Sequence, residues 1–372
     1  MQTVSFSQLD DAALRAWDRL ADRAVEPNPY YRPGFARAAA LADDDPLVMY
    51  ETDGDEWIAC LPISRALRWG RLQMRCFAPW SPDNAFVATP LLDRRAPMAA
   101  ATALVRHIKR TTEVAALVID PIDPDGPAGT ALWHAFTKLA IAPTVYAEWQ
   151  RAALRRRSQP TYLREAMSGK RRKELRRQRR ALGAELGGEI EAVDCTTDPE
   201  AWDLLLNLEQ SGWKGDNGTA LASNRGGAEF FREMCRTESG AGRLQVLSLR
   251  GGGHTAAMQV NLIDGGTMFC FKVAYDQSLA QFGPGVLLEQ DAIEIFHASL
   301  PADFADSCAP PDSELVNRMW PDRRRMQTLI VPSRSRRAAL IGANVAAERL
   351  GRQVVRRARQ RARIRGSDPI ET

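Results

Sequence analysis

The sequence predicts a mixed α/β fold built from two successive units that share one order of elements. That order is a strand, two helices, three strands joined by tight turns, a helix, a strand, a helix and a strand. Glycine-containing turns between short apolar runs indicate the three-strand meanders, because hairpin turns need positive φ angles. Prolines before periodic apolar stretches indicate helix starts, because a first helical turn leaves its N–H groups unpaired.

We place the first unit at residues 1–155. Its predicted elements, in order, are helices Asp10–Ala24 and Pro33–Leu41, strands Pro46–Thr52, Glu56–Ser64 and Gln73–Phe77, helix Pro97–Arg110, strand Val114–Asp120, helix Pro127–Ala140 and strand Thr144–Trp149. The basic stretch Arg151–Pro160 interrupts the pattern, so we expect a domain boundary there. This unit lacks a glycine loop after its third meander strand, and we interpret it as a structural or acceptor-binding partner.

We place the second unit at residues 160–332 and a basic C-terminal helix or tail at 333–372. The predicted elements are a basic helix Tyr162–Leu182, strand Glu189–Asp194, a helix from Pro199, a loop over 212–219, helix Arg225–Thr237, strands Arg243–Arg250, His254–Ile263 and Thr267–Tyr275, a helix from Pro284, strand Asp303–Cys308, helix Glu314–Trp320 and strand Met326–Val331. Asp198 is expected to cap the helix that begins at Pro199.

Positive charge is concentrated in two segments, although the formal net charge is only +4. Residues 151–181 hold thirteen Lys and Arg against two acids, and residues 333–365 hold eleven Arg against one Glu, which leaves −17 on the rest. Such basic segments are expected either to bind an anionic partner, namely phosphates, nucleic acid or an anionic membrane, or to pack against the acidic remainder of the protein. Lys170–Arg180 carries charge nearly all round without interleaved aromatics, so sequence-specific nucleic-acid reading is not indicated. Val345–Arg363 predicts either a helix lying on anionic lipid or a flexible tail.

Composition excludes several classes of protein. The start of the chain lacks the pattern of a signal peptide, and no run of eighteen apolar residues predicts a spanning helix. The six cysteines form no C-x-x-C pair and the four histidines lie far apart, so we expect neither a metal site nor a disulfide framework. We predict a cytoplasmic protein, with peripheral contact at the inner face of a membrane through the basic C-terminal segment.

The most informative motif is a strand that leads through a short loop into a helix. Phe271–Asp276 reads as the strand, and Gln281–Gly285 places glycines on either side of Pro284 at the start of an apolar helix. Free N–H groups and the positive end of the helix dipole meet at such a turn. The sequence therefore predicts a site for the phosphate of a carrier.

This layout resembles the GNAT acyltransferase fold. The motifs are similar to those of CelD/BcsL-type GNAT proteins, which are named for cellulose and exopolysaccharide gene clusters. That family is related to the FemAB transferases, which contain two tandem GNAT domains. The motifs are Trp213-Lys214-Gly215 with Gly218-Thr219, Phe230-Phe231, Phe271-Lys272 with Tyr275-Asp276, Pro284-Gly285 and Trp320-Pro321. The resemblance implies two tandem GNAT-like domains and an acyl donor, acyl-CoA (including acetyl-CoA) or acyl carrier protein. It also implies an amine or hydroxyl acceptor on a small molecule or glycan. One departure is that the usual loop, Arg/Gln-x-x-Gly-x-Gly/Ala, is compressed here and contains a proline.

The candidate site residues follow from this placement. The donor is expected at Gln281, Phe282, Gly283, Pro284, Gly285 and Val286, and the acceptor or its phosphates at Trp213 and Lys214. Asp276 is a candidate base or a cap of its own turn, and Tyr275 is a candidate acid for the thiolate or a sheet aromatic. Glu209 is a candidate base if burial raises its pKa. Lys272 is expected to pair with Asp276 or Glu209, or to bind an anionic substrate.

Two other functions fit the same sequence. One is a FemAB-like transferase that takes amino acids from aminoacyl-tRNA, which the basic helix would suit. The other is a non-catalytic scaffold in polysaccharide biosynthesis.

Overall fold

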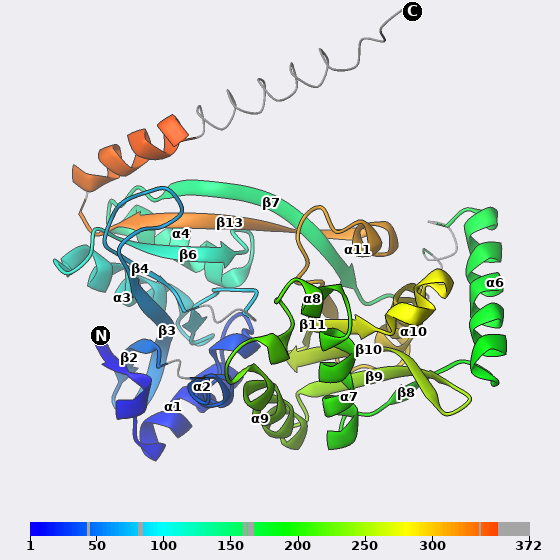
Figure 1. The fold of residues 1–372 in the computed structure, drawn as a ribbon. Coiled ribbons are helices and arrows are strands. Elements are labelled where there is room, and N and C mark those ends of the chain that lie inside the picture. Colours follow the sequence, from blue (N-terminus) through cyan, green and yellow to red (C-terminus); the bar gives the residue numbers. More distant parts are fainter. Residues whose placement is uncertain (43–44, 81–84, 159–161, 163–166, 335, 349–372) are drawn as a thin grey trace, which may run out of the picture.

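The strands of both halves form one continuous sheet in the computed structural model (Figure 1). The structure describes residues 1–42, 45–80, 85–158, 162, 167–334 and 336–348. Across the sheet the strands follow the order β1-β2-β3-β4-β6-β13-β7-β12-β11-β10-β9-β8, with β5 paired to β3. Their bounds are β1 Gln2–Ser5, β2 Leu47–Asp53, β3 Glu56–Ala66, β4 Cys76–Pro79, β5 Leu91–Leu92, β6 Ala116–Ile122, β7 Thr144–Arg155, β8 Glu191–Asp194, β9 Leu244–Gly251, β10 His254–Asp264, β11 Thr267–Tyr275, β12 Phe304–Asp306 and β13 Asp322–Pro332.

The last strand of the chain lies inside the sheet of the first half. β13 runs antiparallel to both β6 and β7, and it separates these two strands. β7 in turn extends into the second half, where Ala153–Arg155 pairs antiparallel with β12. The two halves therefore share strands at their junction.

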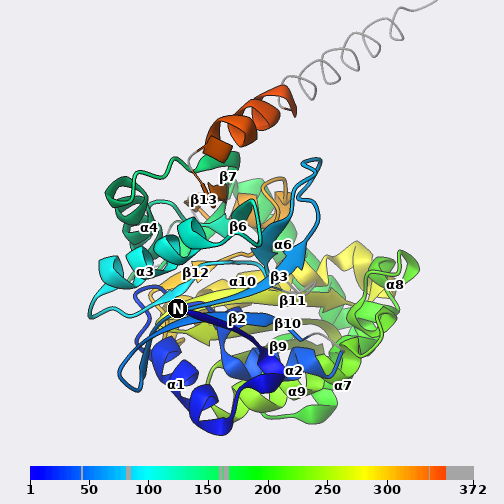
Figure 2. The ribbon, with the colours of Figure 1, turned by 90° about the vertical axis from the view of Figure 1, so that its left-hand side faces the viewer.

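Helices cover both faces of the sheet. In Figure 2, α1, α2, α7 and α9 lie below the strands, whereas α3 and α4 lie at the upper left of the sheet. The bounds are α1 Asp11–Asp22, α2 Pro33–Ala40, α3 Pro97–Arg110, α4 Pro127–Lys138, α6 Gly169–Leu186, α7 Pro199–Gln210, α8 Trp213–Asp216, α9 Gly227–Gly240, α10 Pro284–Ala298 and α11 Glu314–Met319, with short 3₁₀ turns η1 Phe6–Gln8, η2 Pro29–Tyr31, η3 Leu221–Ser223 and η4 Gln277–Phe282.

The predicted elements are largely confirmed, and the exceptions have local causes. Asp198 caps α7 by accepting from the N–H of Glu200, and the glycine-linked meander β9–β10–β11 forms as expected. The predicted end of a strand at Trp149 is wrong, because β7 continues to Arg155 by pairing with β12 and β13. The predicted loop over 212–219 contains the short helix α8. The strands β1 and β5 and the turn η4 were not expected, because each is too short to show a period.

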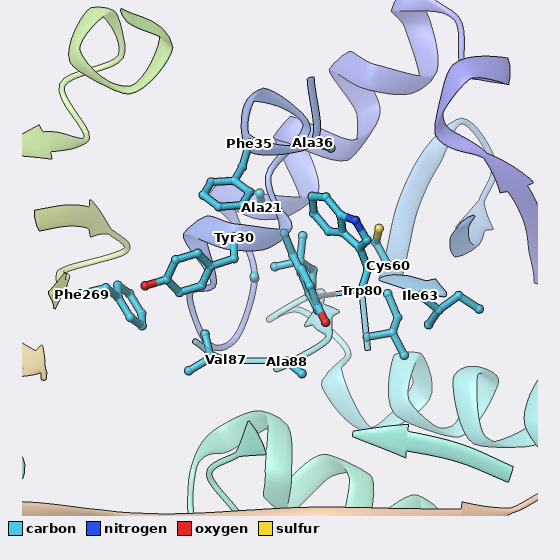
Figure 3. Close-up of a cluster of buried hydrophobic side chains, with 14 of the residues drawn as sticks. Ala21, Tyr30, Phe35, Ala36, Cys60, Ile63, Trp80, Val87, Ala88 and Phe269 are labelled. Atoms are coloured by element: carbon cyan, nitrogen blue, oxygen red, sulfur yellow. The ribbon is translucent and has the colours of Figure 1, made fainter. Parts of the chain in front are cut away.

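An aromatic cluster joins the two halves. Tyr30 and Phe35, from the first half, contact Phe269, Phe271 and Phe230 edge-on, with ring centroids 5.2–6.5 Å apart. Figure 3 shows Tyr30 beside Phe269, with Phe35 above Tyr30 and Trp80 to its right. Phe35, Tyr30 and Phe269 are all at most 1 % exposed. Because burial of rings of this size dominates core energetics, this cluster ties the halves into one packed body.

Buried charges also cross the junction. Asp306, at the end of β12, is fully buried and accepts from Arg151 of β7 at 2.5 Å and Arg324 of β13 at 2.7 Å. Arg324 also forms ion pairs with Glu26, at 2.5 Å, and with Asp123, at 3.0 Å. Burial acts to raise the pKa of Asp306, but the two arginines outweigh it and hold that pKa below its usual value. Each charge in this chain of contacts is compensated, as a buried charge requires.

The beginning of the basic C-terminal segment packs on the first half. Ile341 and Val345 are buried in one cluster with Val118 and Ile330, so Val345 faces the protein. The remainder of the predicted helix, from residue 349, lies outside the described residues. In the described part of the chain, no helix is both long and apolar enough to span a membrane.

Candidate active site

The strands β11 and β12 separate after a short parallel contact. They pair only at Thr267, Met268 and Phe269, opposite Phe304–Asp306. Beyond that point β11 continues to Tyr275 while β12 ends. The edge of β11 from Cys270 onward therefore presents backbone groups that β12 does not pair, which is a place where an extended ligand can bind the strand.

A bulge in β11 lies at the start of this open edge. Val260 of β10 is opposite Lys272, but the next residue, Asn261, is opposite Cys270, so Phe271 is the additional residue. A bulge interrupts the alternation of side chains. Phe271 stacks in parallel on Phe231 of α9 at 6.4 Å, and Lys272 points to the same side, toward α7.

A cluster of one carboxylate and two ammonium groups borders the open edge. Glu209 of α7 is 3 % exposed and lies 2.9 Å from the Lys214 ammonium and 3.7 Å from that of Lys272. Lys214 also donates to the carbonyl of Val273, on the part of β11 that β12 has left. The Leu221 N–H donates to the second oxygen of Glu209 at 2.8 Å. The structure thus brings Lys214, Lys272 and Glu209 together, and of the partners considered for Lys272 it is Glu209 with which the ion pair forms.

The condition for Glu209 to act as a base, a pKa raised by burial, is not met. Burial acts to raise it, but Lys272, Lys214 and the Leu221 N–H favour the carboxylate more strongly, and the pKa lies below its usual value. A carboxylate held in this way is a weak base near neutral pH. Its evident role is to balance the lysines and to hold the α8 segment against β11.

The helix α10 begins where β11 ends. Gly283 adopts a left-handed conformation with φ +64°. It is both the C-cap of η4 and the N-cap of α10, whose first residue is Pro284. The N–H groups of Val286 and Leu287 are bonded back to the Gly283 carbonyl, and Pro284 has none. Within residues 283–287, all of them described, Gly285 therefore provides the N–H that no backbone partner uses. Gln281 is exposed at this turn, whereas Phe282 and Val286 are half-buried against the neighbouring core.

Comparison with known families agrees with this geometry. Residues 169–299 match the family model described as the acetyltransferase (GNAT) domain. The fold of this segment is GNAT-like. The predicted mixed α/β fold is confirmed, and the GNAT segment contains the meander, the bulge, the open edge of β11 and the start of α10. None of the curated proteins matches the chain.

Solved structures resemble most of the chain. One is FemX, with 10 % identity, TM-score 0.58, and coverage of 90 % of this chain and 98 % of FemX. A conserved protein of unknown function from Bacteroides thetaiotaomicron has 12 % identity, TM-score 0.53, and coverage of 87 % and 99 %. The C-terminal domain of a putative lysylphosphatidylglycerol synthetase from Agrobacterium fabrum has 14 % identity, TM-score 0.50, and coverage of 89 % and 95 %. At these identities the likeness shows the fold alone.

Tyr275, the last residue of β11, and Asp276, which follows it, both contact neighbouring residues of the fold. Asp276 caps η4, and one of its oxygens accepts from the Ser278 N–H at 2.9 Å and the Ser278 hydroxyl at 2.6 Å. Tyr275 is half-buried beside the start of α10, where a Cβ on Gly285 would lie 3.7 Å from its ring. Trp213 opens α8, but its side chain lies outside the described part of the structure.

The structure adds a histidine–tyrosine pair that the sequence interpretation missed. His297 of α10 accepts at Nδ1 from the Arg157 N–H at 3.1 Å, and its Nε2 lies 2.8 Å from the Tyr162 hydroxyl. Neutral histidine must then carry its proton on Nε2 and donate it to Tyr162. Burial and the nearby Arg157 and Arg156 lower the pKa of His297, which favours this neutral form. The two residues are far apart in sequence, so no spacing rule could have paired them.

A buried glutamate on the GNAT helix α10 was also missed. Glu289 accepts from the Trp320 indole at 2.6 Å, and burial raises its pKa to about 7 against the effect of that bond. Its position in the apolar helix, three and four residues before buried Ala292 and Ile293, was the available signal. The Trp320-Pro321 motif therefore has a specific partner inside the domain.

We expect Glu289→Gln to stabilise the protein at alkaline pH. The unfolded chain loses this proton near pH 4.5 and the folded chain near 7, so the native glutamate lowers stability as pH rises between those values. The glutamine retains an acceptor for Trp320 but does not titrate. The gain in unfolding free energy should be about 1–3 kcal/mol at pH 8 and should vanish below pH 4.5. Urea unfolding across this pH range measures it, and an unchanged difference between pH 4 and 8 would contradict the assignment.

Proposed function

We propose that the GNAT segment transfers an acyl group from a phosphopantetheine thioester, carried by CoA or an acyl carrier protein, to an amine or hydroxyl acceptor. The observation that carries this proposal is the combination of the open edge of β11 with the helix α10 that starts at its end. The phosphate would lie at Gly285, where a free N–H and the helix dipole favour an anion. The pantetheine arm would pair with the open edge, and the thioester would reach the bulge at Phe271.

The distance between these points fits an extended arm. Phe271 lies four residues before Tyr275, which corresponds to about 13 Å along a strand. Tyr275 is therefore at the phosphate end of the proposed path rather than at the thioester, and it would pack against the carrier instead of protonating the thiolate. Backbone N–H groups near the bulge would stabilise the oxyanion.

The reaction itself needs few charged groups. The acceptor nitrogen or oxygen attacks the thioester carbonyl, the C–S bond breaks, and the leaving thiolate takes up a proton as the acceptor loses one. Because the pKa of Glu209 is lowered and Asp276 is bonded within its turn, positioning and oxyanion stabilisation would provide most of the rate. Lys214 and Lys272 give the opening a positive potential that suits an anionic donor or acceptor.

Isothermal titration with CoA, acetyl-CoA and phosphopantetheine tests the donor, and thiol release with a panel of amines and sugars tests the transfer. Saturable binding of phosphopantetheine with displacement by CoA is the expected result. If neither compound binds, a pantetheine donor is ruled out. The motif set of CelD/BcsL-type proteins supports a glycan acceptor in exopolysaccharide or cell-envelope biosynthesis, so glycan-derived amines and hydroxyls belong in that panel.

A further inference from the structure

The basic helix α6 has one packed face and one charged face. Leu175 and Leu182 are buried against Leu287 and Leu288 of α10, so the charge does not run all round the helix as expected. Lys170, Lys173, Arg177 and Arg180 follow the spacing i, i+3, i+7 and i+10, which puts them on the opposite face, and Arg176 adjoins them. We call these five residues the α6 stripe. All five residues are exposed, and the stripe is about 15 Å long.

The acidic body of the protein does not neutralise the stripe. Arg179, outside the stripe, pairs with Asp291 of α10 and bonds the Ile190 carbonyl. Within the stripe, Arg177 pairs with Glu174 of the same helix. Lys170, Lys173, Arg176 and Arg180 make no side-chain hydrogen bond or ion pair within the described part of the chain. Like charges at this spacing repel one another, so an anionic partner would relieve a real cost.

The helix α6, which carries the stripe on its outer face, adjoins the turn at which the donor would bind. α6 contacts both η4 and α10. Gln178 of α6 lies so close to the turn that a Cβ on Gly283 would be 3.7 Å from its amide nitrogen. A donor whose phosphate lies at Gly285 would therefore bring whatever carries that phosphate alongside α6.

The extent and chemistry of the stripe indicate the type of carrier. Four uncompensated cations along about 15 Å exceed what the single 3′-phosphate of CoA would neutralise. The helix exposes no large apolar side chain, which disfavours insertion into a lipid surface, and it has no aromatic residue on which bases could stack. A row of carboxylates on a small folded protein matches it by charge and by length.

We propose that the α6 stripe is the docking surface for an acidic acyl carrier protein, which delivers its phosphopantetheine arm to the start of α10. This inference rests on the proposed donor function and specifies the donor class. It implies that acyl carrier protein is preferred to acyl-CoA, because only the former contacts the stripe.

The test compares charge reversals on two surfaces. Lys173→Glu/Arg176→Glu/Arg180→Glu reverses three of the five stripe charges, and Arg15→Glu/Arg106→Glu/Arg110→Glu changes three exposed arginines on α1 and α3 by the same total charge. Binding of a bacterial holo-acyl carrier protein is measured at 50 and 300 mM NaCl, and CoA binding is measured in parallel. We expect the first variant to lose about tenfold or more in affinity at low salt, the control less than about threefold, and both to bind CoA like the wild type.

Each other outcome has a definite meaning. Wild-type protein that binds CoA but not the carrier protein, or a stripe variant that binds the carrier protein normally, overturns the docking surface and leaves the donor function intact. Bulk tRNA that binds more tightly than the carrier protein, with loss in the stripe variant, overturns it in favour of a nucleic-acid partner. Failure of wild-type protein to bind either CoA or phosphopantetheine counts against the donor function instead.

Discussion

Gly285→Glu is expected to weaken donor binding about 100-fold while the protein stays folded. The residue lies in the first turn of α10, where an acidic side chain interacts favourably with the helix dipole. Space is available, because a Cβ there would meet the Tyr275 ring at an ordinary 3.7 Å. The new carboxylate would occupy the place of the donor phosphate and repel it. Affinity for CoA or phosphopantetheine should fall about 100-fold, which corresponds to about 3 kcal/mol.

Gly285→Gln is the matched control, because it has nearly the same size and no charge. Its affinity should fall less than about tenfold, and both variants should melt at or above the wild-type temperature. Titration calorimetry and thermal unfolding give the two readouts. Equal affinities of the Glu and Gln variants would show that no phosphate binds at this turn.

Asp306→Asn is expected to be the most destabilising of the substitutions considered. The carboxylate is fully buried and compensates Arg151 and Arg324, which are 3 % and 8 % exposed. Asparagine keeps the shape of the side chain but removes the negative charge that compensates the two buried guanidinium groups. Removing one partner from such a group costs about 3–5 kcal/mol in unfolding free energy. Urea unfolding at pH 7 measures this loss.

The same substitution has a defined dependence on pH. The pKa of Asp306 is lowered in the folded protein, so its contribution is complete above the usual aspartate value near 3.8 and disappears as pH falls through the lowered folded value. The difference between wild type and variant should therefore be constant from pH 5 to 7 and should shrink in acid. Glu314→Gln, in the exposed pair with Arg318, should cost less than about 0.5 kcal/mol. A loss at Asp306 no larger than that would contradict its role at the junction.

Much of the second half could be predicted because its signals are local. The glycine turns that join β9, β10 and β11, the cap of α7 by Asp198 and the start of α10 at Pro284 each depend on neighbours within a few residues. Residues 169–299, which match the GNAT domain, contain all of these elements. Hydrophobic period and turn chemistry are sufficient there.

The features that local signals do not determine were missed or misjudged. The direction of Lys272 depends on the bulge at Phe271, which exists only when β10 and β11 are paired. The pKa of Glu209 depends on two lysines brought by α8 and β11, and burial alone suggested the opposite direction. The contact of Tyr162 with His297 spans 135 positions of sequence. In each case tertiary contacts determine the chemistry of the residue.

The position of β13 has a consequence for how the protein is made. Because β13 lies between β6 and β7, the sheet of the first half cannot close until the ribosome has produced residue 332, well after the first half has emerged. Until then β6 and β7 present unpaired edges, which are prone to associate with other strands. The chain is therefore a single cooperative unit in biosynthesis, and a gene fragment that encodes only the first half would produce an incomplete sheet.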